Sequence, residues 1–143
     1  MYKNNKILVG KNDNNEANLL LDKANRHGLI TGASGSGKTI TLKVLAEGFS
    51  ASGVPVILSD VKGDLAGTSL IGNLDLIKDR VDKLGINDFN IQKFPVTFFD
   101  VYGVSGHPIR TTVKSIGSRL LSHMLNLTDT QESVLSVVFK ICE

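Results

Sequence analysis

The feature that most constrains this chain is the segment 32–39, GASGSGKT, which fits the phosphate-binding pattern G-x-x-x-x-G-K-[ST] at every fixed position. Its three glycines allow backbone torsions that other residues avoid, so successive N–H groups can turn inward and surround an anion. Lys38 is expected to reach the β- and γ-phosphates and neutralise charge in a transition state, and the Thr39 hydroxyl is expected to ligate Mg²⁺. The predicted ligands are therefore ATP or ADP with Mg²⁺, held by Gly32, Ala33, Ser34, Gly35, Ser36, Gly37, Lys38 and Thr39.

The flanks of this loop support the same interpretation. Residues 27–31, HGLIT, form a short apolar run of the kind that buried parallel strands show. After the loop, apolar residues recur at helical spacing, at Leu42, Leu45, Ala46 and Phe49. Strand, glycine-rich turn and helix thus occur in the order that phosphate binding requires. The alternative is a glycine-rich connection between a strand and a helix, without any ligand.

A second strand is predicted over residues 54–60, VPVILSD. A strand–helix–strand connection of this length is a βαβ crossover, so the two strands should be parallel neighbours. Ligands of such sheets bind beyond the carboxyl ends of the strands. Asp60 is therefore a candidate metal contact, within one bridging water of Thr39, and Lys62 and Asp64 are candidate water, metal or phosphate contacts. The alternative is a strand-end turn in which Asp64 caps the next segment of the chain.

Arg26 and His27 lie where the chain leads into the strand before the loop and are weaker candidates for contact with a nucleotide, because solvated or packing roles suit both side chains. His107 lies in the turn sequence SGHP and is expected to be exposed.

The whole pattern predicts an α/β fold, with a mostly parallel sheet flanked by helices. Residues 7–10 and 19–22 should pair as a short antiparallel lead-in. An amphipathic helix is expected over 68–85, strands over 95–103 and 109–113, a helix over 115–125, and another after the capping-box sequence that begins at Thr128. We expect one domain, 1–143, with the lead-in at 1–24 and a nucleotide-binding core at 25–143.

Composition excludes few functions. The net charge of +2, carried by scattered lysines and arginines, does not argue for nucleic-acid binding. The single cysteine, Cys142, cannot form an intrachain disulfide and suits a reducing cytoplasm. No signal peptide and no apolar stretch of membrane-spanning length is present in the sequence. A cytoplasmic protein without a membrane partner is expected.

Five segments together carry a family resemblance: RHGLITG at 26–32, the loop at 32–39, DVKGDL at 60–65, PVTFFDVYG at 95–103, and residues 127–143. In this order they resemble the N-terminal part of bacterial HerA-like helicase-domain proteins, in the HerA/FtsK branch of RecA-like P-loop ATPases. The resemblance implies a RecA-like fold and a DNA-associated, ATP-hydrolysing helicase or translocase. It also implies homo-oligomers, namely hexamers that bind ATP between subunits.

The chain departs from the family in one respect. Members carry a Walker B strand that ends in an acidic pair, but here Asp60 is followed by Val61 and Asp100 by Val101. No arginine finger is identified, and Arg110 and Arg119 are interpreted as surface or packing residues. The chain is therefore interpreted as a truncated portion of the ATPase domain that binds ATP and turns it over very slowly alone. The alternatives are a small-molecule or nucleotide kinase, which would need an arginine-rich lid, and a nucleotide-regulated binding module without turnover.

Overall fold

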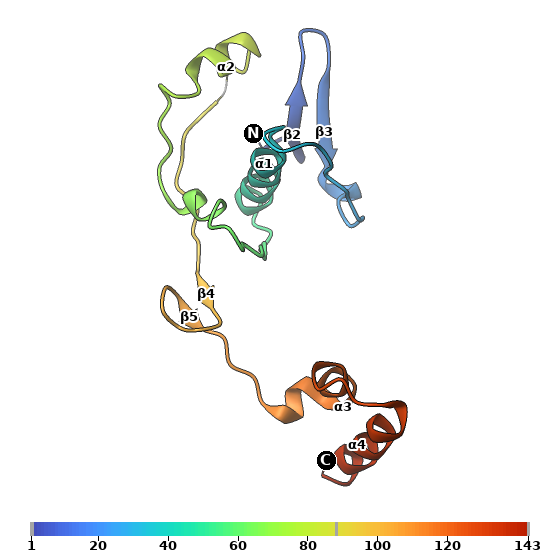
Figure 1. The fold of residues 1–143 in the computed structure, drawn as a ribbon. Helices are drawn as coiled ribbons and strands as arrows, with labels where there is room; N and C mark the ends of the chain where they lie inside the picture. The colour runs from blue at the N-terminus through green and yellow to red at the C-terminus, as the bar shows by residue number, and fades with distance from the viewer. Residues whose placement is uncertain (1, 88, 143) are drawn as a thin grey trace. The chain divides into compact units, whose positions relative to one another are not determined.

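The computed structural model describes residues 2–87 and 89–142, and the chain divides after Val96 into two compact units (Figure 1). The first unit contains β1 (Tyr2–Lys3), β2 (Lys6–Lys11), β3 (Glu16–Leu20), α1 (Lys38–Ala51) and α2 (Lys78–Lys83), with short 3₁₀ helices η1 (Leu21–Lys23) and η2 (Ala66–Ser69). The second contains β4 (Phe99–Asp100), β5 (His107–Pro108), α3 (Val113–Met124) and α4 (Asp129–Ile141). The single domain expected over 1–143 stays a prediction.

The N-terminal lead-in is an antiparallel sheet in the order β1-β2-β3. Its longer turn is held by Asn12, whose side-chain oxygen accepts hydrogen bonds from the backbone N–H groups of Asn14 at 3.2 Å and Asn15 at 2.8 Å. Such Asx turns let a short polar connection reverse the chain. The expected antiparallel pairing is confirmed, with Ile7 opposite Leu19 and an irregularity between Leu8 and Gly10, but the second strand is Glu16–Leu20 and not 19–22, since Leu21 and Asp22 belong to η1.

The core of the first unit forms where β2 meets α1. Ile7, in β2, is 0% exposed, and a Cβ atom added to Gly48 of α1 would lie 2.5 Å from the Ile7 side chain. No side chain at position 48 could be accommodated without displacing Ile7, so the glycine permits this close approach. Ala46 and Leu65 are the other buried apolar residues among those described.

The parallel sheet expected from residues 27–31 and 54–60 is absent from the described residues. Both segments are without regular secondary structure and join no strand ladder. Leu29 is 87% exposed and Ile57 is 99% exposed. An interior parallel strand needs hydrogen-bonded neighbours at its edges and packed layers on both faces, and neither segment has them here. The observed class is α/β with two small sheets.

Three further expectations are corrected in the same way. The amphipathic helix over 68–85 is replaced by η2 and the six-residue α2. Between them the Asn73 side chain accepts a hydrogen bond from the Asp75 N–H at 2.9 Å, a local turn that competes with helix. The strand over 95–103 shortens to β4, and the strand over 109–113 gives way to the start of α3 at Val113. His107 is exposed as expected, but it lies in β5, paired in parallel with Phe99 of β4.

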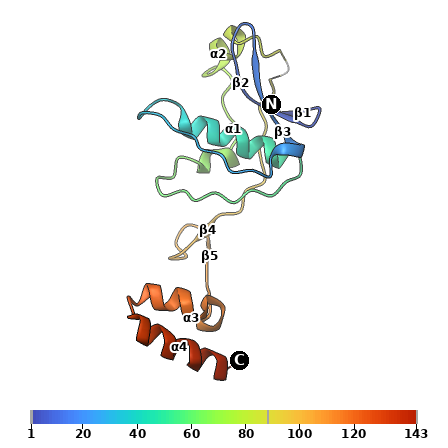
Figure 2. The same ribbon diagram turned by 90° about the vertical axis from the view of Figure 1, so that its right-hand side faces the viewer.

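The second unit is dominated by a helical hairpin. Helices α3 and α4 lie side by side (Figure 2), and the Ser136 hydroxyl bonds to that of Ser118 across them at 3.2 Å. The helix start predicted at Thr128 is confirmed, because the Thr128 N–H donates to Gln131 Oε1 at 2.9 Å in a reciprocal capping box. Gly117, with φ of 76°, kinks α3.

Candidate nucleotide-binding site

The segment 32–39 ends on the N-terminus of α1, as its pattern predicts. Gly37 is the residue that precedes the helix, with φ of 92°, and α1 begins at Lys38. Gly35 is also left-handed, with φ of 77°. No acidic side chain lies in the first turn of α1, and no side chain caps it. The first N–H groups of a helix have no partner within the helix, so this terminus can accept an anion.

The Lys38 side chain folds back across the loop. Its Nζ donates hydrogen bonds to the carbonyl oxygens of Gly32 at 2.8 Å and Ala33 at 2.7 Å. A Cβ atom at Gly32 would collide with the Ser36 hydroxyl, and it would lie 3.7 Å from Cγ of Lys38. The glycine therefore lets Ser36 approach the start of the loop closely. The ammonium group is fixed at the loop that is predicted to hold phosphates.

The Thr39 hydroxyl has no hydrogen bond within the part of the chain that the structure describes, and the residue is half-buried. Two residues later, Thr41 makes a different use of its hydroxyl, which donates to the Gly37 carbonyl at 3.3 Å. Thr39 therefore keeps its oxygen available for a metal ion. Its assignment to Mg²⁺ stays a prediction.

Asp60 forms a turn at the end of the segment 54–60. One carboxylate oxygen accepts from the Gly63 N–H at 2.8 Å, and the other accepts from the Leu65 N–H at 2.9 Å. Desolvation acts to raise the pKa of Asp60, but the backbone hydrogen bonds, led by those from Leu65 and Gly63, together outweigh it and lower this pKa. Asp60 thus holds a turn, as its alternative interpretation described, although no strand precedes it. A water-mediated contact with the metal stays a prediction.

The remaining candidates gain no contacts with the loop. Arg26, His27, Lys62 and Asp64 have exposed side chains, and their roles stay predictions. Arg110 donates to the carbonyls of Val101 and Ile109 at 3.4 and 3.2 Å, in agreement with a packing role. Within residues 2–87 and 89–142, no group of three or more His, Cys, Asp or Glu residues could hold a metal ion.

A second loop in which one aspartate accepts several backbone hydrogen bonds was not predicted from the sequence. Asp100 accepts backbone hydrogen bonds from Tyr102, Val104 and Ser105 at 2.9, 2.7 and 2.9 Å. These bonds, led by that from Ser105, lower the pKa of the Asp100 carboxyl. A signal was present in the sequence, because D-V-x-G occurs at 60–63 and again at 100–103. In both loops the glycine is left-handed, with φ of 79° and 69°.

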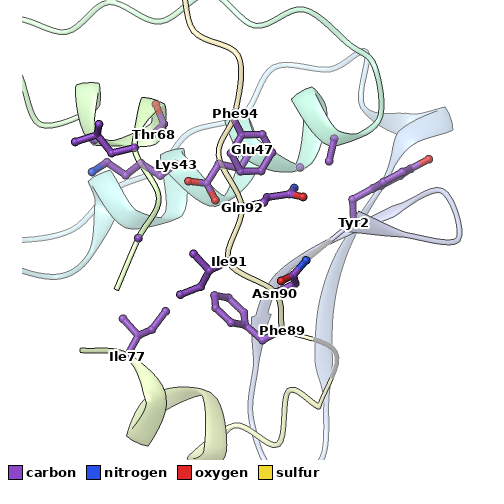
Figure 3. Close-up of a pocket in the computed structure, with 15 residues that line it drawn as sticks. Tyr2, Lys43, Glu47, Thr68, Ile77, Phe89, Asn90, Ile91, Gln92 and Phe94 are labelled. Atoms are coloured by element: carbon purple, nitrogen blue, oxygen red, sulfur yellow. The ribbon is translucent and has the colours of Figure 1, made fainter. Parts of the chain in front are cut away.

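A hollow of about 250 Å³ along the C-terminal half of α1 was not predicted either (Figure 3). Lys43 and Glu47 line it from the helix, and residues 89–92 and Phe94 line it from the other side. The hollow is not the phosphate loop, since Glu47 lies nine residues after Lys38, or about 14 Å along a helix. Backbone N–H groups at a helix N-terminus, not an apolar cavity, are what bind phosphate, so the loop 32–39 stays the predicted phosphate site.

Comparison with known families gives one match. A family described as "Helicase HerA-like C-terminal" matches residues 5–143. No curated protein and no solved structure matches the chain. The description refers to a C-terminal region, whereas the sequence motifs had placed these residues in the N-terminal portion of the ATPase domain. No helix in the described part of the chain is both long and apolar enough to cross a membrane.

Proposed function

Because the chain belongs to the HerA-like helicase family, we propose that residues 32–39 are a Walker A loop that binds ATP or ADP with Mg²⁺ in a DNA-acting ATPase. The observation that carries this proposal is the junction at Gly37 and Lys38. There a left-handed glycine leads into a helix whose first turn holds no acidic residue, and the lysine ammonium lies at the loop.

The proposed binding mode assigns one role to each group. The N–H groups of the loop and of the first turn of α1 surround the β-phosphate, where the helix dipole also favours negative charge. Lys38 exchanges its two carbonyl partners for β- and γ-phosphate oxygens. The free Thr39 hydroxyl ligates Mg²⁺, and Asp60 reaches the ion through a water molecule.

The proposal includes the sheet and the assembly. In a RecA-like fold, residues 27–31 and 54–60 would pair in parallel beside the loop, and their exposed apolar side chains, Leu29 and Ile57, would be covered. ATP would lie between subunits of a hexamer that acts on DNA. Turnover by these 143 residues alone should be very slow, since no acidic pair comes after an apolar run to orient the attacking water.

Calorimetry with ATP and Mg²⁺ tests the binding step. We expect Lys38→Ala to abolish detectable binding, because the phosphates lose their cation. Lys83→Ala, at an exposed lysine in α2, is the matched control and should bind as the parent does. Circular dichroism of each variant verifies that the helices persist. Unchanged affinity in a folded Lys38→Ala variant would remove the Walker A assignment.

Phosphate release with Mg²⁺, with and without DNA, tests the turnover step. We expect rates far below about one per second, the lower end of typical enzyme turnover. DNA-stimulated release at that rate or faster would contradict the prediction that these residues turn ATP over very slowly. Transfer of phosphate to a small acceptor instead of water would favour the kinase alternative.

A further inference from the structure

The loop that joins β4 to β5, residues 101–106, is closed by hydrogen bonds to its own backbone (Figure 1). At its base, the His107 N–H donates to the Phe98 carbonyl at 2.8 Å. Within it, the Asp100 carboxylate accepts hydrogen bonds from three backbone N–H groups. A Cβ atom at Gly106 would lie 2.7 Å from the Phe98 carbonyl oxygen, so only glycine lets the chain close this tightly. The loop is therefore a firm support for the side chains that it carries.

The aromatic side chain on this loop is Tyr102, which is 86% exposed. Its backbone N–H donates to the Asp100 carboxylate at 2.9 Å, so the backbone is held while the ring lies in solvent. Val101 and Val104 are exposed beside it. Aromatic rings bury about 150–250 Å² when a partner covers them, which makes them major contributors to binding. The loop thus presents an uncovered ring for contact with another molecule.

The same region carries the net positive charge of the chain. Lysines and arginines are spread along the sequence, but residues 97–128 contain only one carboxylate, that of Asp100, against three basic side chains. These residues alone therefore account for the net charge of +2. The basic side chains are Arg110, Lys114 and Arg119, which are exposed and have no carboxylate partner within the described residues. A surface of this kind attracts a polyanion.

Arg110 brings one of these charges to the loop. Its Nη1 donates to the Val101 carbonyl at 3.4 Å, so the guanidinium lies beside the residue that precedes Tyr102. A guanidinium has five N–H donors in a planar fork, so others remain for a phosphate. An exposed ring beside a cation is the combination that binds single-stranded nucleic acid, because bases stack on the ring and the cation contacts the backbone. A protein partner could cover the ring, but apolar contact alone makes no use of the charge.

We propose that the β4–β5 loop binds single-stranded DNA, with one base stacked on the Tyr102 ring and a neighbouring phosphate on Arg110. Lys114, the second residue of α3, adds a weaker phosphate contact four residues further along the chain. A single strand is required because the bases of a duplex are already stacked on each other. The inference rests on the proposed function only for the choice of DNA over RNA.

The stacking contact is tested by fluorescence anisotropy of a labelled oligothymidylate titrated with the full chain. We expect Tyr102→Ala to weaken binding by about five- to a hundredfold, the range for loss of one stacked base. Tyr102→Phe keeps the ring and should retain the affinity. Val104→Ala, at an exposed side chain of the same loop, is the matched control. An abasic strand of equal length should bind the parent more weakly and should not distinguish Tyr102→Ala from it.

The phosphate contact is tested by the salt dependence of the same binding. Arg110→Met should weaken binding and reduce the slope of log affinity against log salt by about 0.7, the value for one phosphate of a single strand. Arg110→Lys keeps the charge and should keep the slope. Lys83→Met, at an exposed lysine of the first unit, is the control and should change neither quantity. Circular dichroism verifies that each variant is folded.

Several outcomes would overturn the proposal. These are no binding in low salt at protein concentrations up to about 100 µM, unchanged affinity in folded Tyr102→Ala, or equal affinity for the abasic strand. Tighter binding of a duplex, or of an oligouridylate than of the matching deoxy strand, would assign the loop to another nucleic acid. Binding without salt dependence would indicate apolar contact. Lys38→Ala should bind the strand as the parent does and Tyr102→Ala should bind ATP normally, so failure here is distinguishable from failure of the nucleotide site.

Discussion

The β2–β3 hairpin and the two segments 27–31 and 54–60 have similar apolar content but different structures. Ile7 of β2 is completely buried, whereas Ile57 is almost completely exposed, at 99%. The hairpin strands are joined by the short Asn12–Asn15 turn, so their pairing costs little loop-closure entropy. The other two segments are separated by the loop and α1. Pairing them in parallel would require closing this long connection, since parallel strands cannot be joined by a short turn.

The same two regions also differ in how far their side chains are covered by other residues. Ile7 packs against Gly48, where the backbone of α1 comes close enough to exclude water. Ile57 has no such partner in the described structure. Apolar sequence alone therefore does not determine a strand. A strand also needs a hydrogen-bonded neighbouring strand and a side-chain layer that covers its face, and both come from other parts of the protein.

The largest expected effect comes from truncating one isoleucine in each region. Ile7→Ala should lower the free energy of unfolding by about 2–5 kcal/mol, because it leaves a cavity against α1. Ile57→Ala is the matched control and should change it by less than about 0.5 kcal/mol, as exposed substitutions do. Urea denaturation monitored by circular dichroism measures both. A loss of several kcal/mol in Ile57→Ala would mean that residues 54–60 are packed in solution, as the parallel sheet requires.

A smaller effect is expected from Gly48→Ala, which tests the contact from the helix side. The added methyl group would lie 2.5 Å from Ile7, so overpacking should cost about 1–3 kcal/mol. That loss should exceed the gain of about 1 kcal/mol in helix propensity. Gly28→Ala is the control, since a Cβ atom there meets nothing within 4 Å. A Gly48→Ala variant more stable than the parent in urea would show that Ile7 and α1 do not pack this closely.

The smallest effect concerns the Asp60 turn that ends the segment 54–60. Because hydrogen bonds in the folded state lower its pKa, the ionised carboxylate stabilises the turn above the ordinary aspartate pKa of about 3.9. This stabilisation of the turn is lost as the pH falls through the lowered pKa of Asp60. We expect the protection of the Gly63 and Leu65 amides against exchange, relative to an unfolded peptide at the same pH, to fall in acid in the parent and to be independent of this titration in Asp60→Asn. An acid response that persists in Asp60→Asn would assign the titration to another group.

The features that the sequence predicts well are local. The loop 32–39, the start of α1 at Lys38 and the capping box at Thr128 depend on residues within a few positions of each other. The parallel sheet was predicted but is absent from the described residues, because a sheet depends on partners far apart in sequence, which a local apolar pattern does not report. The hollow was missed for the same reason. Its walls come from α1 and from 89–94, which no periodicity relates.

The two carbonyl oxygens that hold Lys38 have a consequence for ligand selectivity. A free lysine side chain carries about 2 kcal/mol of rotamer entropy, and here the rotamer is already fixed before any ligand arrives. A ligand therefore competes with two existing hydrogen bonds instead of ordering a flexible chain. A neutral molecule gains too little from the ammonium to displace Gly32 and Ala33, whereas a polyphosphate offers several charged oxygens at once. In the proposed site, the loop would therefore select polyphosphates over neutral ligands, because binding would require this exchange of hydrogen bonds.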